Sequence, residues 1–298
     1  MRRWRAVAAM GLVGTAAPPA ERIVTGDRLV AITVGGLPLR FRIDPGVPGL
    51  PLVAAPVAER LSLRGGGLLA LGVAFSIGHE RFYGRTQVVR LGWNGTTAGK
   101  RRVGWLFRAY PLAVDGTIGP AGVPEQVVRF AFHAPRAGER TVTLPMAGGG
   151  GLFGDWFALG AAITVGGKPL MIRFDPDHAL TLVTAPAGVR LAAANGGTLT
   201  AQTARQEIAY GVERPLRVMR LARPLAVGPL SLTSLAVRIT DGGGANTIPE
   251  AGADPAEVMV TARGRQQPGV MTVGADQLDR CSSLVFDKGA RQVRLSCS

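Results

Sequence analysis

The chain has 298 residues, of which 47% are apolar, and a formal net charge of +14. This length and apolar content suffice to bury one large core or two moderate ones, which excludes a disordered chain. The positive charge comes mostly from scattered arginines without a run of five basic residues, so a nucleic-acid partner is not expected. Gly (42) and Pro (21) separate short apolar runs, a pattern that favours strands over helices.

Residues 1–20 have the layout of a secretory signal peptide. Arginines near the start precede a short apolar stretch that ends in small residues at Ala17 and Ala20. We expect cleavage there and export of the mature chain, as a periplasmic or secreted protein. An attached segment, disordered or tethering the chain to a membrane, is the alternative. Beyond this segment no run of about 18 apolar residues occurs, so no membrane span is expected after cleavage.

A strand, a tight turn and a second strand occur twice, within residues 32–56 and 163–186. The two copies begin ITVGGLPLRFRIDPG and ITVGGKPLMIRFDPD. In each, the second strand ends in an Asp followed by Pro, at Asp44 and Asp175. Identities this dense indicate an internal duplication. The segments PVAERLSL and PAGVRLAA, which follow the two loops, are expected to form short helices.

The ends of the two halves also correspond. Residues 115–144 and 269–295 each contain a turn, Thr-Ile-Gly or Thr-Val-Gly, a short segment of helical character and a closing hairpin. Residues 146–151 are Gly-rich and form a flexible linker by composition. We therefore predict an all-β fold of two lobes, residues 21–145 and 152–298, each a closed or partly open barrel.

The last segment contains both cysteines, Cys281 and Cys297, at equal distances from Gly289. A hairpin turn at Gly289, with this glycine at positive φ, would place the cysteines opposite each other on neighbouring strands. A disulfide is then expected in an exported chain. Two reduced core cysteines are the alternative.

Together these motifs resemble those of the retropepsin and pepsin type of aspartic protease, and in particular of bacterial exported proteins with a retropepsin-like domain. The resemblance rests on the repeated ITVGGxPLxxxxD, the following LxLVxAP, the TIG and TVG triplets, and the closing GADQLDRCSSLVFDKGARQVRL. It covers nearly all of the mature chain. It implies a bilobal monomer with a cleft, an extended peptide or protein segment as partner, no cofactor and no metal.

The resemblance also implies roles for particular residues. Asp44 and Asp175 correspond to the catalytic pair, because two carboxylates about 3 Å apart share one proton and can activate water. Gly119 and Gly274 would let another strand pass close beneath each loop. In the family a flap covers the cleft, and the residues at that place are Phe82 and Tyr83. Ordinary hairpin aromatics are the alternative for these two.

Both loops depart from the family's Asp-Thr-Gly or Asp-Ser-Gly. Pro45 and Pro176 supply neither a hydroxyl nor an N–H, so the hydrogen bonds that link the family's two loops are lost. Gly46 retains the family's glycine, whereas Asp177 replaces it and introduces a third carboxylate and a Cβ. That carboxylate is expected to add like-charge repulsion at the pair.

Other interpretations of these loops stay open. An Asp before Pro is a common turn initiator, which gives Asp44 and Asp175 a purely structural alternative. Asp175, Asp177 and His178 are also residue types that bind metals, but no partner motif accompanies them.

Two functions follow from this sequence. The first is an aspartic-type endopeptidase, a hydrolase in which Asp44 and Asp175 activate water to cut extended peptides. The second is a catalytically inactive module of the same fold in the cell envelope, which holds a peptide or protein segment by strand addition.

Overall fold

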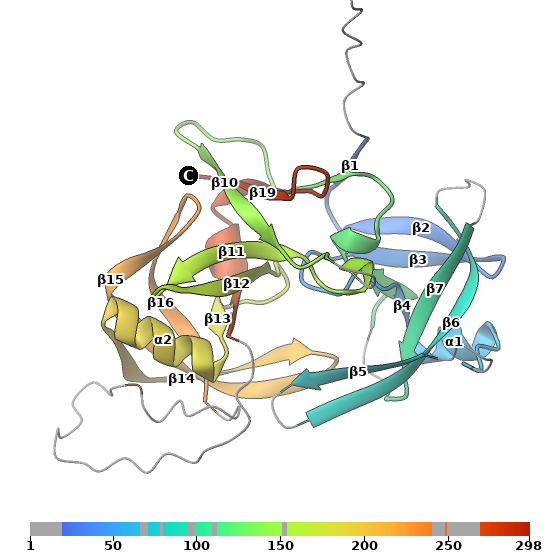
Figure 1. Ribbon diagram of the computed structural model, residues 1–298, viewed down its shortest axis with the longest axis horizontal. Helices are drawn as coiled ribbons and strands as arrows, with labels where there is room; N and C mark the ends of the chain where they lie inside the picture. The colour runs from blue at the N-terminus through green and yellow to red at the C-terminus, as the bar shows by residue number, and fades with distance from the viewer. Residues whose placement is uncertain are drawn as a thin grey trace, which may run out of the picture.

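The structure is a computed structural model that describes residues 20–65, 71–77, 80–93, 99–108, 112–150, 154–239, 248 and 269–298. Strands dominate these residues and form two sheets (Figure 1), which confirms the prediction of a bilobal all-β fold. The seven-stranded sheet has the order β2-β3-β8-β4-β7-β6-β5. Its strands are β2 (Leu29–Val34), β3 (Leu37–Ile43), β4 (Leu52–Val53), β5 (Gly72–Ile77), β6 (Glu80–Trp93), β7 (Gly99–Leu106) and β8 (Gly116–Ile118).

The second sheet has twelve strands in the order β1-β9-β18-β19-β10-β11-β12-β17-β13-β16-β15-β14. They are β1 (Glu21–Val24), β9 (Val127–Ala131), β10 (Arg140–Ala147), β11 (Gly160–Val165), β12 (Lys168–Phe174), β13 (Leu182–Val183), β14 (Gly197–Ala209), β15 (Val212–Val227), β16 (Leu230–Arg238), β17 (Val270–Val273), β18 (Cys281–Asp287) and β19 (Gln292–Cys297). The helices are α1 (Ala55–Arg60), α2 (Ala185–Asn195), α3 (Ala275–Leu278) and the short 3-10 turns η1 (Pro120–Gly122) and η2 (Gly154–Trp156).

The repeated sequence folds twice into the same hairpin, β2–β3 and β11–β12. The two-residue turns are Gly35-Gly36 and Gly166-Gly167, and all four glycines have positive φ. Such a turn matches the twist of the flanking strands, and glycine adopts it without steric strain. The second strand of each hairpin then pairs in parallel with a short strand from the end of the same half, β3 with β8 and β12 with β17. The carboxyl ends of β3 and β12 are thereby held between neighbours.

The predicted helices form directly after these loops. Both α1 and α2 have Pro in their first turn, where the missing N–H would have no helical acceptor. The longer α2 ends at Gly196, which has φ 69° and closes the helix in the left-handed conformation. The sequence signals that start and end these helices are therefore local.

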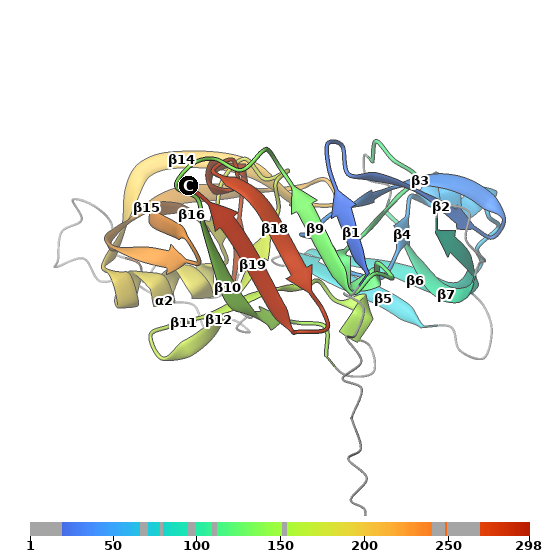
Figure 2. The ribbon, with the colours of Figure 1, turned by 90° about the horizontal axis from the view of Figure 1, so that it is seen from above.

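Strands β9, β18, β19 and β10 lie side by side between the two lobes (Figure 2). Strands from both halves of the chain thus share one continuous sheet. Beneath it, Phe130, Phe174 and Phe286 are fully buried, and the ring of Phe286 meets the other two edge to face with centroids 6.1 and 6.4 Å away. Strand β10 runs through Ala147, so the first two residues of the Gly-rich segment 146–151 belong to a strand.

The disulfide between Cys281 and Cys297 is present, as predicted, with the two residues paired across β18 and β19. The predicted turn geometry was wrong in one respect. Asp287 pairs with Gln292, and the turn residue at positive φ is Arg291 (φ 56°), whereas Gly289 has no positive φ. The strand register sets which turn residue takes the left-handed conformation, and a glycine in the turn does not decide it.

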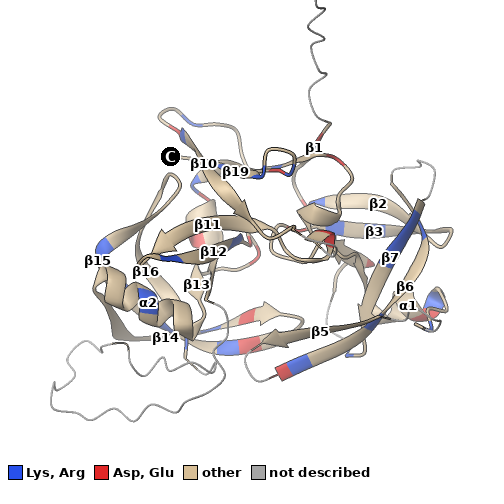
Figure 3. Cartoon of the chain, in the orientation of Figure 1, with Lys and Arg blue, Asp and Glu red and all other residues tan. Residues whose placement is uncertain are grey.

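Charged side chains are distributed over both lobes (Figure 3). Blue Lys and Arg segments occur on strands of both sheets and on α2, in keeping with the scattered arginines of the sequence. Among the described residues, no helix has the length and apolar character needed to cross a membrane.

Candidate functional site

Asp44 and Asp175 occupy equivalent positions, one residue beyond the ends of β3 and β12. The backbone N–H of Asp44 donates to the carbonyl of Ile118, and that of Asp175 donates to the carbonyl of Val273, in the parallel neighbour strands. These bonds fix both backbones at the ends of buried strands. The duplicated sequence is therefore duplicated in backbone hydrogen bonding as well.

Each aspartate also closes its own tight turn. Asp44 Oδ1 accepts the backbone N–H of Gly46 at 2.8 Å, and Asp175 Oδ1 accepts the N–H of Asp177 at 3.0 Å. The residue between acceptor and donor is proline in both turns, and its fixed φ suits the second position of a turn. Backbone hydrogen bonds close the same turns, from the N–H of Val47 to the carbonyl of Asp44 at 3.5 Å and from the N–H of His178 to the carbonyl of Asp175 at 3.2 Å. Since proline has no hydroxyl or N–H to donate, the aspartate side chains supply the additional hydrogen bonds.

The two turns bring three carboxylates together. One carboxylate oxygen from each of Asp44, Asp175 and Asp177 lies within 4.8 Å of the other two. Because an oxygen of Asp44 lies no more than 4.8 Å from one of Asp175, a single water molecule about 2.8 Å from both oxygens can form a hydrogen bond with each carboxyl group. A Cβ at Gly46 would lie 2.8 Å from Asp175 Oδ2, so only glycine allows the first loop to approach the second aspartate this closely.

The environment of Asp44 favours its protonated form. Burial, followed by the negative charge of Asp175, raises the pKa of Asp44 from 3.8 to about 7. The guanidinium of Arg28 and the N–H of Gly46 act in the opposite direction, and Asp177 adds a smaller rise. Below about pH 7 Asp44 is therefore mostly protonated.

Asp177 lies beside the pair and also contacts the first lobe. It forms ion pairs with Arg28, which precedes β2, and with Arg42 of β3, the latter at 3.4 Å. These contacts join the second Asp loop to the first lobe. The predicted like-charge repulsion from Asp177 is present, but it is the smallest of the causes that shift the pKa of Asp44. The guanidinium groups of Arg28 and Arg42, which lie beside Asp177, offset its negative charge.

The donor set does not favour a metal ion. Three carboxylates within reach of one another are a possible cation site, yet Asp177 uses both oxygens on Arg28 and Arg42. Two guanidinium groups beside the cluster would repel a cation. His178, the other metal-ligand type in this loop, has Nε2 3.1 Å from the carbonyl of Ile208 and 3.5 Å from Asp175 Oδ2.

Gly119 and Gly274 lie where other backbone passes very close. A Cβ at Gly119 would lie 2.1 Å from the carbonyl oxygen of Val47, and one at Gly274 would lie 2.6 Å from that of His178. Both carbonyls belong to the Asp loops themselves, a few residues past each aspartate. The two glycines therefore let the Asp loops fold back onto β8 and β17.

Two hairpins, β5–β6 and β14–β15, meet between the lobes (Figure 1). Tyr210, at the tip of β14–β15, packs against Phe75 and Phe82 of β5–β6, with ring centroids 5.2 and 6.2 Å away. Arg214 of β15 adds a 3.0 Å ion pair with Glu80 of β6. Since Ile208 on the same hairpin contacts His178, the joined hairpins lie close to Asp175.

The flap candidates Phe82 and Tyr83 have opposite environments. Phe82 is 3% exposed and packs against Tyr210, whereas Tyr83 is 55% exposed. Adjacent strand residues point to opposite faces, so only one of the two can face the partner hairpin. Tyr210 and Arg28 carried no motif in the sequence, and only their contacts reveal them. Arg42 belongs to the repeated segment, but its contact with Asp177 was not predicted.

The raised pKa of Asp44 gives a prediction for stability. A group whose folded pKa lies above its unfolded value contributes stability at low pH that is lost as pH rises through the folded pKa. Between pH 5 and pH 8 the free energy of unfolding of the wild type should therefore fall by about 2 to 3 kcal/mol because of Asp44, and that of D44N should not show this fall. Urea unfolding of both proteins at the two pH values measures the difference, and equal pH dependence would contradict the assignment.

The Asp177 ion pairs give a second prediction. R28Q should lower the free energy of unfolding by about 1 to 2 kcal/mol, because Arg28 is 12% exposed and its loss leaves Asp177 beside two carboxylates. D177N should reduce the cost of R28Q in a double-mutant cycle measured by urea unfolding. R60Q is the matched control, because the ion pair of Arg60 with Asp115 involves a more exposed arginine. Its loss should lower the free energy of unfolding by about 0.5 kcal/mol or less. Equal costs for R28Q alone and in the D177N background would refute the interaction.

Comparison with known proteins finds similarity among solved structures. No family model matches the chain, and a search of curated proteins finds no match either. Among solved structures the chain is similar to an aspartic proteinase from Irpex lacteus, with 12% sequence identity and a TM-score of 0.40, over 91% of this chain and 94% of that chain.

Proposed function

We propose that the chain is an aspartic-type endopeptidase that hydrolyses extended peptides with Asp44 and Asp175. The observation that carries the proposal is the meeting of two aspartates from duplicated loops, with carboxylate oxygens within 4.8 Å and the pKa of Asp44 raised to about 7. One protonated and one ionised carboxyl group is the state that general acid-base hydrolysis needs.

The proposed roles follow from the two environments. Asp175 takes a proton from a water held between the carboxylates, and the resulting hydroxide equivalent adds to the peptide carbonyl carbon. Asp44 gives its proton to the carbonyl oxygen as the tetrahedral intermediate forms. The C–N bond then breaks when the leaving nitrogen takes the proton that Asp175 acquired, while Asp44 recovers its own proton as the carbonyl re-forms. The pair ends with one proton, as it began.

Pro45 and Pro176 are compatible with a catalytic role for Asp44 and Asp175. In the family's loops a hydroxyl after each aspartate links the two sides, and Pro45 and Pro176 lack it. The ion pairs of Asp177 with Arg28 and Arg42 supply another link between the second loop and the first lobe. Charge-assisted hydrogen bonds are typically stronger than neutral ones, so one such link is a reasonable substitute.

The joined hairpins limit the substrate. A chain that reaches Asp175 from the side of His178 must pass between or displace β5–β6 and β14–β15, which are held together by an aromatic cluster and by Arg214 with Glu80. An extended, unfolded segment needs a much smaller separation of these hairpins than a folded protein does. We therefore propose unfolded polypeptide as the substrate class.

The same proposal includes the setting of the enzyme. We propose an exported monomer with lobes at residues 21–145 and 152–298 after removal of residues 1–20. The disulfide between Cys281 and Cys297 supports an oxidising compartment. Both Asp loops belong to one chain, which supports a monomer.

A second candidate is the inactive binding module, and one observation favours it. The contacts of Tyr210 and Arg214 with the opposite hairpin would slow entry and release of any peptide. A segment that threads beside the Asp pair would then be held for long times.

A cleavage assay distinguishes the two candidates. The mature protein is incubated with a denatured, fluorescently labelled protein from pH 3 to pH 9. We expect cleavage that declines with an apparent pKa of about 7, because ionisation of Asp44 removes the proton that the reaction needs. D44N and D175N should each lower the rate roughly 100- to 10,000-fold.

D279N, which changes an exposed aspartate at the end of α3, is the matched control and should cut like the wild type. Sensitivity to a pepstatin-type inhibitor should accompany the activity. Peptide binding by fluorescence anisotropy, without cleavage at any pH, would replace the endopeptidase with the binding module.

A further inference from the structure

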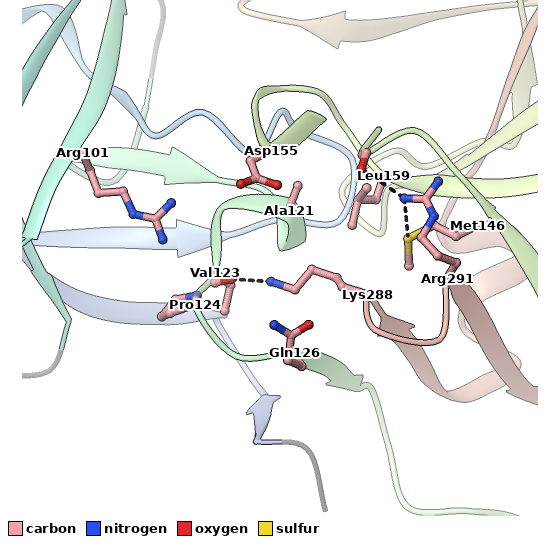
Figure 4. A pocket seen from close by; sticks show the side chains of 11 residues that line it. Arg101, Ala121, Val123, Pro124, Gln126, Met146, Asp155, Leu159, Lys288 and Arg291 are labelled. Atoms are coloured by element: carbon pink, nitrogen blue, oxygen red, sulfur yellow. Dashed lines mark hydrogen bonds between the residues drawn. The ribbon is translucent and has the colours of Figure 1, made fainter. Parts of the chain in front are cut away.

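A pocket of about 320 Å³ lies apart from the aspartate cluster, and neither Asp44 nor Asp175 lines it. Its walls come from η1, η2, β7, β10 and the turn between β18 and β19, so both halves of the chain contribute (Figure 4). The size is that of a site for a small molecule and is too small for a folded partner.

The charged groups of the pocket are unbalanced. Arg101, Lys288 and Arg291 line it together with one acidic residue, Asp155. Within the described part of the chain, no carboxylate oxygen lies within 4.0 Å of a side-chain nitrogen of these three basic residues. The charges of Asp155 and Glu125 favour the charged form of Lys288 and that of Arg101 opposes it. With three basic residues and one acidic residue in its walls, the pocket keeps a net positive charge that a bound anion would reduce.

Lys288 is the central group of this pocket. Its ammonium donates one hydrogen bond to the carbonyl of Val123, which leaves two of its three N–H donors for a ligand. Its side chain is half-buried, and burial is the main cause that lowers the pKa of Lys288. A partly desolvated ammonium gains more from an oxyanion than an exposed one does.

The other cations are placed at opposite ends. In Figure 4 Arg101 enters from one side and Arg291 lies on the other, with Lys288 and Gln126 between them. Arg291 donates to the carbonyls of Gly149 and Gly148 at 3.1 and 2.8 Å, which fixes its guanidinium at that end. Positive groups separated in this way suit a ligand with acidic groups at both ends.

We propose that this pocket binds a small organic or inorganic anion with two or more acidic groups, either carboxylates or phosphates. Lys288 and Arg101 contact one acidic group, and Arg291 contacts the other. Asp155 faces the pocket as well and favours a ligand that also carries a hydroxyl or another hydrogen-bond donor.

Isothermal titration calorimetry at pH 7 tests the proposal with two probes, citrate for carboxylates and pyrophosphate for phosphates. We expect saturable one-to-one binding of at least one probe at an ionic strength held constant with sodium chloride. K288Q and R101Q should each weaken it about tenfold or more, because each removes a charge-assisted contact. K288R, which keeps the charge, should retain most of the affinity.

R140Q is the matched control, because it removes one positive charge from an exposed residue at the start of β10, outside the pocket. It should bind like the wild type, and circular dichroism checks that all variants are folded. Binding of citrate alone or of pyrophosphate alone identifies the acidic group. Absence of saturable binding for both probes, or equal affinity in K288Q, R101Q and R140Q, would overturn the proposal.

Discussion

The structure depends on holding two carboxyl groups of like charge close together at the meeting of two lobes. Asp44 and Asp175 lie on separate loops, and each loop is anchored by a backbone hydrogen bond to a parallel strand of its own half. Bringing the loops together costs electrostatic free energy, which the molecule reduces by keeping a proton on Asp44. The duplicated hairpins, the glycines behind the loops and the shared central sheet all serve to keep this pair in place.

The two loops reach this arrangement by different means. Gly46 leaves room for Asp175, since a side chain there would collide with the carboxylate. At the equivalent position of the second loop, Asp177 has a side chain, and it is accommodated because it points to Arg28 and Arg42. The two copies of the loop therefore differ at this position. The difference supplies a contact between the lobes, which the prolines of the loops cannot make because they lack a hydroxyl and an N–H.

Much of the fold could be predicted from the sequence because its signals are local. The Gly-Gly turns, the Asp-Pro loops and the Pro that starts each helix act through neighbouring residues, so the two similar stretches form the same hairpin, loop and helix. The cysteine pairing followed from a hairpin of the correct length even though the left-handed residue proved to be Arg291 and not Gly289.

The contacts that surround the pair could not be predicted in this way. Arg28 and Asp177 are 149 residues apart in the chain, and nothing in either segment identifies its partner. Likewise, Phe82 packs against Tyr210 of the other lobe as well as against Ile77 and Leu106 of its own. Such contacts depend on how the lobes are placed relative to each other, which the shared sheet and the long hairpins set together. The basic pocket also needs the fold, because its cations come from β7 and from the β18–β19 turn.

Asp44 and Asp175 should behave as one proton-sharing pair. Titration of the aspartate side-chain carboxyl groups by 13C nuclear magnetic resonance tests this directly. We expect Asp44 to titrate with a pKa of about 7 and D175N to lower this pKa, because the negative charge of Asp175 is one of the causes that raise it. A wild-type Asp44 that titrates near 3.8, unchanged by D175N, would show that the two aspartates do not share a proton.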